Sequence, residues 1–238
     1  MTIGVIIFTY NRPHMLLEAL ASARRNRPDK IIICDDGSDP AVPYMGEDVT
    51  IMRLPSRTPE ERIAKNMSGH LGNLARSLIG TDYIAWLCDD DLMAAGWLDY
   101  VRKQPLAPLY IGGVNIFKDD VLTGKDWKDI DHSPSEMTTG NWVERTDLSV
   151  RWGNYAFSGD ARYVWELLNV CGQKNVLKPP SNLPYDPWAA ADEMTANEIV
   201  MQWVHPRLAL HYRNHELTLG NLLKAGKAGE QFKKGTME

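Results

Sequence analysis

Residues 83–91 read YIAWLCDDD, an apolar run followed directly by three aspartates. Such a run predicts a strand that is covered on both faces, as in a parallel sheet. Neighbouring carboxylates repel one another unless a cation neutralises them, so the aspartates indicate a cation at the end of this strand. Carboxylate oxygens suit Mg²⁺ or Mn²⁺. The alternative is a solvated loop or a helix cap, since both favour Asp.

Three further apolar runs lie upstream, at residues 3–8, 31–34 and 49–54, and helical patterns separate them. This alternation predicts an α/β fold with a doubly wound, mostly parallel sheet flanked by helices. Ligands of such sheets bind beyond the carboxyl ends of the strands. The polar loops that follow the strands, including Asp35-Asp36-Gly37-Ser38 and the aspartate run, are therefore expected to line a ligand site.

Two helices are predicted between these strands. Asn11 is expected to cap the first, with Pro13 in its first turn. Thr58 and Glu61 have the spacing of a capping box at the start of the second, and Gly80 is placed to end it. The apolar residues predicted to mark one face of the second helix are Ile63, Met67, Leu71, Leu74 and Leu78.

The second half of the chain is less regular. Residues 118–141 turn polar and contain helix breakers, which predicts a long loop or a subdomain boundary. The chain is therefore expected to divide into residues 1–117, 118–215 and a tail at 216–238. Later elements are predicted as a strand at 155–158, a helix at 160–170 ended by Gly172, a helix around Met194 and a strand at 207–212.

The composition argues against several classes of protein. The formal net charge of −5 offers no basic surface of the kind that nucleic-acid backbones require. Cys34, Cys88 and Cys171 are three in number and far apart, so neither a disulfide framework nor a cysteine metal motif is expected. The apolar start is too short to span a bilayer and lacks the features of a signal peptide. These features favour a cytoplasmic protein with no transmembrane segment.

The chain resembles family 2 glycosyltransferases of the GT-A fold, in the nucleotide-diphospho-sugar transferase superfamily. The match covers about the first hundred residues, and the combination of motifs is more specific than any one of them. The matching segments are Val5–Arg12, Ile33–Ser38, the helix from Asn73 into Gly80-Thr81-Asp82-Tyr83-Ile84, and Leu87–Leu92.

The resemblance implies a Rossmann-like GT-A sheet whose first half, residues 1–117, binds a nucleotide sugar, with a smaller acceptor-binding half at 118–215. Arg62 and Arg76, on the helix before the aspartate run, are further candidates to reach the nucleotide, although a solvated helical arginine is the simpler interpretation of each. The residues that the resemblance places at the nucleotide are Thr9, Tyr10, Arg12, Asp35, Asp36 and Asp89.

For the metal, the resemblance implies Asp90 or Asp91, with Asp90 preferred, holding Mn²⁺ or Mg²⁺ against the diphosphate. Many family members carry an acidic residue where Cys88 stands, so the Asp-x-Asp motif has two possible registers that differ by one residue. Near the C-terminal end, Tyr212-Arg213-Asn214-His215 is similar to a family segment in which Arg213 and His215 would approach the diphosphate or metal. His211 is an alternative to His215.

Glycosyl transfer with inversion needs a carboxylate that deprotonates the acceptor hydroxyl. Asp192 resembles the family's base, and Glu193 is its rival because the order of the pair is reversed here. Acidic residues also favour the first turn of a helix, which is an equally good explanation of the pair. Trp152, Arg162 and Phe157-Ser158-Gly159 resemble the part that shapes the acceptor pocket.

The sequence thus predicts a metal-dependent hexosyltransferase-type enzyme that moves a sugar from a nucleotide-diphosphate donor, with UDP-sugars favoured, to an acceptor hydroxyl. The acceptor stays open among glycans, lipid-linked molecules and small molecules. A non-catalytic GT-A protein that binds a nucleotide sugar is the main alternative. A sugar-phosphate nucleotidyltransferase is weaker, because the first loop lacks the glycine-rich phosphate motif expected of one.

Overall fold

The structure of the protein is a computed structural model, and it describes most of the predicted nucleotide-binding half. The described residues are 1–58, 61, 68–118, 121–122, 139–140, 142–153, 159–172, 176–177 and 208–213.

Seven strands form the central sheet, in the order β10-β6-β9-β4-β1-β2-β3. Strands β1 to β4 run parallel, whereas β9 runs antiparallel between β4 and β6. The bounds are β1 Ile3–Thr9, β2 Lys30–Asp35, β3 Val49–Arg53, β4 Tyr83–Cys88, β6 Leu109–Ile111, β9 Trp142–Arg145 and β10 Val176–Leu177.

A smaller sheet has the order β5-β11-β7-β8, with β11 antiparallel to β5 and parallel to β7. Its strands are β5 Asp91–Met93, β7 Gly113–Lys118, β8 Val121–Leu122 and β11 Leu208–Arg213.

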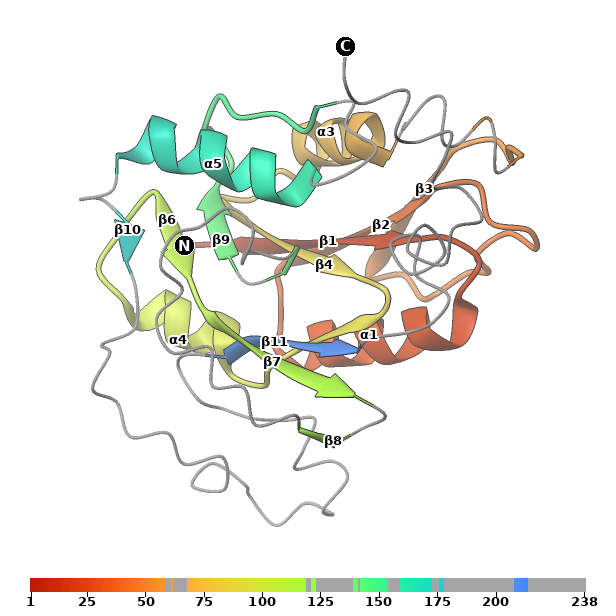
Figure 1. Cartoon of the computed structure of the whole chain (residues 1–238), viewed down its shortest axis with the longest axis horizontal. Coiled ribbons are helices and arrows are strands. Elements are labelled where there is room, and N and C mark those ends of the chain that lie inside the picture. Colours follow the sequence, from red (N-terminus) through yellow and green to blue (C-terminus); the bar gives the residue numbers. More distant parts are fainter. Residues whose placement is uncertain are drawn as a thin grey trace.

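Helices cover both faces of the central sheet, with α1 and α4 on one side and α3 and α5 on the other (Figure 1). Alternate residues of β1 explain this arrangement: Val5 and Ile7 pack in the core with α1 and α4, and Ile6 packs in the core with α3 and α5. The bounds of the helices are α1 Pro13–Arg25, α3 Ser68–Ile79, α4 Trp97–Lys103 and α5 Gly159–Cys171. The doubly wound, mostly parallel sheet predicted from the sequence is confirmed.

Several local predictions hold as well. The Thr58 hydroxyl accepts a hydrogen bond from the Glu61 N–H at 3.2 Å, and the Glu61 carboxylate accepts one from the Thr58 N–H at 2.9 Å, which is the predicted capping box. Helix α5 ends before Gly172, whose φ of 69° is the left-handed conformation that glycine favours. Strand β11 lies at the predicted position. The predicted strand at 155–158 and the helix around Met194 lie outside the described residues.

Asn11 does not cap α1, contrary to the prediction. The N-cap residue is Arg12, and no side chain caps the helix. Asn11 has a φ of 53°, a left-handed conformation that Asn tolerates. Its N–H donates to the Ser38 hydroxyl at 2.9 Å, and its side-chain oxygen accepts from the Asp39 N–H at 2.7 Å. Asn11 therefore ties the loop after β1 to the loop after β2.

The predicted face of α3 is also partly wrong. Leu71 is buried, but the side chains of Leu74 and Leu78 are 45% and 53% exposed. The buried residues nearby are Ala75, Arg76 and Ile79. The buried side of α3 carries small residues and an arginine held in an ion pair. The pattern of large apolar residues therefore predicts the wrong boundary for the buried face of the helix. Ile63 and Met67 lie outside the described residues.

Gly72 lets α3 approach the sheet closely, because a Cβ atom at this position would lie 2.7 Å from the Phe8 ring. We expect Gly72→Ala to lower the free energy of unfolding by about 1–3 kcal/mol through overpacking. Ser77→Ala, on the exposed face of the same helix, is the matched control and should stay within about 0.5 kcal/mol. Urea unfolding measures both, and equal stability of the two variants would show that the helix can move away from Phe8 without penalty.

Candidate active site

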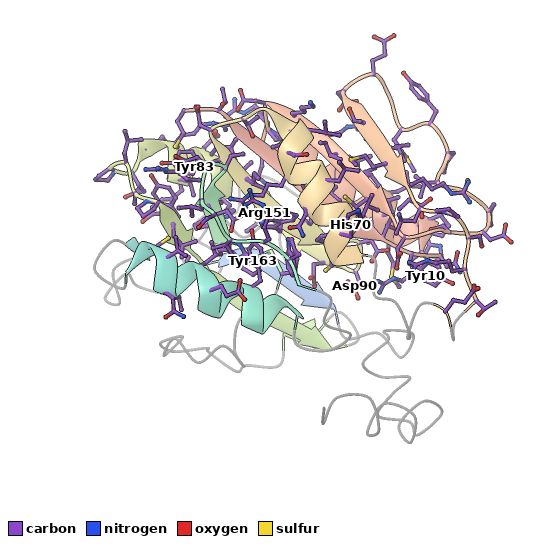
Figure 2. The ribbon with its side chains drawn as sticks, turned by 90° about the horizontal axis from the view of Figure 1, so that it is seen from above. Tyr10, His70, Tyr83, Asp90, Arg151 and Tyr163 are labelled. Atoms are coloured by element: carbon purple, nitrogen blue, oxygen red, sulfur yellow. The ribbon has the colours of Figure 1, made fainter. Side chains whose placement is uncertain are left out.

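The loops after β1, β2 and β4 meet at one edge of the central sheet. The parallel register places Phe8 beside Cys88 and Thr9 beside Asp35, so the three polar loops begin at the same level. The chain runs outward from β1 through β2 to β3 and then returns to β4 on the other side of β1, which creates the reversal where ligands of open α/β sheets bind. Figure 2 shows Tyr10 and Asp90 at this edge and Tyr83, the first residue of β4, at the opposite edge.

Arg12 neutralises part of the aspartate run. One of its guanidinium nitrogens, Nη2, lies 2.6 Å from Asp89 Oδ1, and the other, Nη1, lies 2.6 Å from Asp90 Oδ2. Asp89 is fully buried, and its Oδ2 also accepts hydrogen bonds from the Thr9 hydroxyl at 2.7 Å and the Tyr10 N–H at 3.2 Å. Arg12 thus supplies part of the positive charge that the aspartate run was predicted to need.

Burial controls the protonation of this cluster. It raises the pKa of Asp89 to about 6, although the positive charge of Arg12 acts in the opposite direction. Burial also disfavours the charge of Arg12, but the neighbouring Asp90 and Asp89 outweigh it and raise the pKa of the guanidinium. Arg12 therefore stays charged and holds Asp89 and Asp90 together at the end of the strand.

The loop after β2 is built as a tight turn. Asp35 is fully buried, and its Oδ1 accepts the Ser38 N–H at 2.8 Å, which closes the turn. Gly37 has a φ of 83°, and a Cβ there would lie 2.5 Å from the Pro55 carbonyl oxygen, so only glycine fits. The Asp35 carboxylate is thus engaged inside the protein, and its predicted contact with the nucleotide stays a prediction.

Two arginines that were not predicted as site residues support this turn: Arg53 ends β3, and Arg57 follows four residues later. Arg53 donates to the Ser38 carbonyl at 2.6 Å, and its Nε lies 3.3 Å from Asp35 Oδ2. Arg57 forms a close ion pair with Asp36. The signal in the sequence is the segment RLPSR at 53–57, which begins with the last residue of β3. Its pairing with Asp35 and Asp36 depends on the parallel register of β2 and β3.

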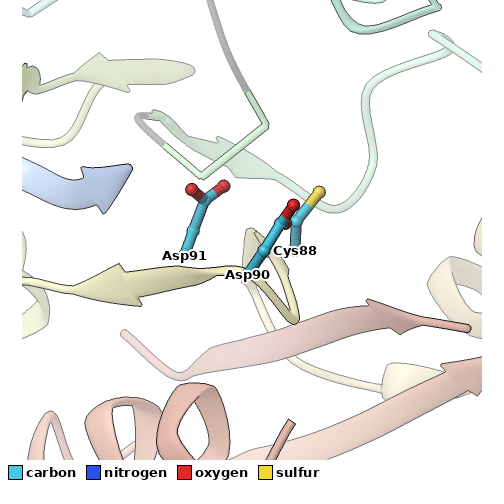
Figure 3. A group of neighbouring side chains, drawn as sticks. All are labelled: Cys88, Asp90 and Asp91. Carbon is cyan, nitrogen blue, oxygen red and sulfur yellow. The ribbon is translucent and has the colours of Figure 1, made fainter. Parts of the chain in front are cut away.

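Cys88, Asp90 and Asp91 bring one ligand atom each to within 4.8 Å of one another (Figure 3). Cys88 ends β4, and Asp91 begins β5, so a sharp turn between two sheets presents the three side chains together. Asp90 and Asp91 are 6% and 1% exposed. Two buried carboxylates with a third donor fit the coordination of a divalent cation that completes its shell with substrate phosphate and water. Burial, with the charges of Asp90, Asp91 and Asp89, raises the pKa of the Cys88 thiol.

A cavity of about 320 Å³ adjoins this cluster, between the loops after β1 and β2. Among the described residues it is lined by Thr9, Arg12, Pro13, Ser38 and the segment Pro40-Ala41-Val42-Pro43. A larger cavity, of about 700 Å³, lies at the opposite edge of the sheet beside Asp82 and Tyr83. The smaller cavity is the better candidate ligand site, because it lies at the carboxyl ends of the parallel strands.

The structure brings β11 to the same region. Tyr212 pairs with Asp91 in the antiparallel ladder between β11 and β5, so the backbone of Arg213 follows directly beside the aspartate run. The side chains of β11 are not described, and neither is that of Arg162, which lies on α5. His215, Arg62, Asp192, Glu193 and residues 157–158 lie outside the described residues. The predicted roles of these residues stay predictions.

Arg76 does not reach this site. It is 3% exposed and forms a buried ion pair with Glu144 on β9. The sequence predicts either a nucleotide contact or a solvated helical arginine, and neither interpretation is correct. The partner of Arg76, Glu144, lies on β9, a strand that the apolar pattern does not predict. Asn73 has a structural role, since it exchanges two hydrogen bonds of 2.8 Å with the backbone of Trp152.

Comparison with known proteins agrees with this geometry. Residues 4–156 match the model of glycosyl transferase family 2. No curated protein sequence matches the chain. Within the described residues, no helix has the length and apolar character needed to cross a membrane.

Among solved structures, the chain is similar to TarS from S. aureus. One TarS 1-349 structure is 12% identical with a TM-score of 0.55, and the match covers 78% of this chain and 59% of that chain. TarS 1-349 in complex with UDP is 10% identical with a TM-score of 0.54, over 91% of this chain and 61% of that chain. The chain thus spans less than two thirds of the length of these proteins. The likeness confirms the predicted GT-A fold.

Proposed function

This chain belongs to glycosyl transferase family 2, and we propose that it transfers a sugar from a nucleotide-diphosphate sugar to an acceptor hydroxyl, with inversion at the anomeric carbon. A UDP-sugar is the favoured donor. The observation that carries the proposal is the meeting of Arg12, Asp89, Asp90 and Asp91 beside a cavity at the carboxyl ends of β1, β2 and β4.

The nucleotide would occupy the cavity between the loops after β1 and β2. Its volume of about 320 Å³ lies at the lower end of the range for small-molecule sites, and Pro40, Val42 and Pro43 give it apolar walls that suit the flat face of a base. Thr9, Tyr10, Asp35 and Asp36 would border the base and ribose. Arg12, which lines the cavity and also contacts the aspartates, would face the diphosphate.

Asp90 and Asp91 would hold Mn²⁺ or Mg²⁺ at the entrance to this cavity, and the bound ion would neutralise charge on the diphosphate as it leaves. The protein prepares this place by burying both carboxylates and by fixing Asp89 through Thr9, Tyr10 and Arg12. Arg213, the last residue of the strand paired with β5, and His215, two residues later in the sequence, would approach the same phosphate.

In the transfer step the acceptor oxygen bonds to the anomeric carbon as the bond from that carbon to the phosphate oxygen breaks. The nucleoside diphosphate leaves with the electron pair, and the acceptor proton passes to a carboxylate. We assign this base to Asp192, with Glu193 as its neighbour and rival. The acceptor stays open, and location in the cytoplasm remains a prediction that agrees with the three free cysteines.

The sharpest test of the nucleotide site is the dependence of UDP binding on a divalent cation. We expect UDP to bind more tightly with Mn²⁺ than with EDTA, and Asp90→Asn to weaken the Mn²⁺-dependent binding by about 10–100-fold through loss of a ligand. Isothermal titration calorimetry measures both, and thermal unfolding checks that the variant is folded.

The matched control is Asp99→Asn, which removes an aspartate on α4 that pairs with Arg27 and Arg102, away from the proposed site. This variant should bind UDP as the original protein does. UDP binding that is the same in Mn²⁺ and EDTA would contradict the metal assignment. Failure to bind UDP in either condition, together with binding of another nucleoside diphosphate, would contradict the choice of donor.

A further inference from the structure

Cys88 is the last residue of β4 and stands where the protein turns from the central sheet into β5. Its thiol sulfur belongs to the group of three ligand atoms that lie within 4.8 Å of one another, together with carboxylate oxygens of Asp90 and Asp91 (Figure 3). The other two cysteines are different, since Cys34 on β2 and Cys171 at the end of α5 are buried in the hydrophobic core. Cys88 is thus the cysteine that faces the proposed diphosphate site.

The surroundings of Cys88 favour a cation over a neutral apolar neighbour. Asp89, Asp90 and Asp91 are all less than 7% exposed, and Arg12 forms ion pairs with Asp89 and Asp90. A divalent ion beside these neighbouring carboxylates would offset the repulsion between them. The donor set that would meet such an ion contains a sulfur atom as well as oxygens.

Sulfur changes which ions bind well. Carboxylate, carbonyl and water oxygens suit Mg²⁺, which demands near-ideal octahedral oxygen geometry, whereas thiolate ligands favour softer transition metals. We propose that the Cys88 sulfur is a third protein ligand of the cation held by Asp90 and Asp91, and that it makes the site prefer softer ions such as Co²⁺ and Zn²⁺ over Mg²⁺. This inference rests on the proposed function of the site, and it specifies the cofactor.

On binding, the thiol gives up its proton to solvent and contributes a thiolate. The ion then carries a softer ligand on one side and leaves its remaining positions to phosphate oxygens and water. An oxygen ligand at position 88 removes this preference without moving Asp90 or Asp91. Residue 88 therefore determines which cation the site prefers.

Cobalt provides a readout that does not depend on activity, because a thiolate bound to Co²⁺ gives a charge-transfer band in the near ultraviolet. We expect this band on titration of the full chain with Co²⁺, and its loss in Cys88→Ser and Cys88→Asp. Equilibrium dialysis with Mn²⁺, Co²⁺ and Mg²⁺ gives the affinities. The ratio of Co²⁺ to Mg²⁺ affinity should fall by about 10-fold or more in Cys88→Asp, whose donor set is all oxygen.

Cys171→Ala is the matched control, since it removes a thiol from the core and should keep the band. Thermal unfolding shows whether each variant is folded, and Cys88→Ala provides a second variant if Cys88→Asp is not. Absence of the band in the original protein, or an unchanged Co²⁺ to Mg²⁺ ratio in the folded variants, would overturn the role of Cys88. If Asp91→Asn still abolishes Mn²⁺ binding in that case, the metal site of the proposed function stands. If no ion binds the original protein, both fail.

Discussion

Asp192→Asn is expected to lower kcat for sugar transfer by about 10²–10⁴-fold, the usual contribution of a general base, while UDP affinity stays unchanged. The amide is similar in size and shape to the carboxylate but does not accept the proton of the acceptor hydroxyl. Because the base acts on the acceptor, its loss should leave binding of the nucleotide to the loops after β1 and β2 intact. A transfer assay with Mn²⁺, a panel of UDP-sugars and mixed acceptors measures the rate, and calorimetry measures the affinity.

Glu193→Gln is the matched control, because it makes the same chemical change one residue further along the chain. A larger loss of kcat in Glu193→Gln than in Asp192→Asn would reverse the assignment of the base. If the original protein binds a UDP-sugar and no acceptor in the panel is glycosylated, and Asp192→Asn leaves this behaviour unchanged, the chain is a nucleotide-sugar-binding member of the family and not an enzyme. Formation of a new nucleotide sugar from a sugar phosphate would instead indicate the nucleotidyltransferase alternative.

The sequence predicts well those parts of the site whose structure depends on the local pattern of apolar and polar residues. The apolar runs at 3–8, 31–34 and 83–88 become parallel strands because burial on both faces selects continuous apolar sequence. The position of the polar loops at one edge then follows from the direction of the strands. For the same reason the family could be recognised, since its motifs lie in these loops.

The parts that were missed depend on contacts between distant segments. The aspartate run needed a cation, but nothing local indicates that Arg12, 78 residues away from Asp90, supplies one. The local sequence predicts a single loop at residues 89–91, whereas Asp91 begins β5 because β11, far along the chain, provides its partner strand. The pairing of Arg57 with Asp36 depends likewise on the register of β2 and β3.

Strand β9 shows the same limit in the core. Its sequence, Trp142–Arg145, contains two charged residues, so a pattern of apolar residues does not identify it as a central strand. Glu144 is nevertheless fully buried, because Arg76 crosses from α3 to pair with it. Hydrogen bonds from Tyr163 Oη at 2.5 Å and Trp142 Nε1 at 3.2 Å complete the surroundings of the carboxylate. A charge can lie between β4 and β6 only when all of these partners are present together.

Loss of the ion pair between Arg76 and Glu144 should strongly destabilise the protein. Arg76→Met should lower the free energy of unfolding by about 3–5 kcal/mol, the usual consequence of leaving a buried charge without its partner. The variant also removes the guanidinium that donates to the carbonyl oxygens of Arg145, Thr146 and Leu148 at 3.0 to 3.1 Å. Urea unfolding of the two proteins measures the difference. The double variant Arg76→Met/Glu144→Gln should recover part of it, because it removes the unpaired charge.

The loss should depend on pH in a defined direction. Burial raises the pKa of Glu144, and the charge of Arg76 partly opposes this, so the pKa rises further in Arg76→Met. A carboxyl group whose pKa is higher in the folded than in the unfolded state contributes stability at low pH that is lost as pH rises through the folded pKa. Arg76→Met should therefore be less destabilised at about pH 5 than at about pH 8.

Arg145→Met provides the control, because Arg145 forms an ion pair with Asp147 in which the two side chains are 46% and 67% exposed. Exposed pairs of this kind contribute about 0–1 kcal/mol, so this variant should unfold almost as the original protein does at both pH values. If Arg76→Met and Arg145→Met have equal stability, or if the loss in Arg76→Met does not change with pH, then Glu144 does not carry a buried charge and the ion pair does not hold α3 to β9.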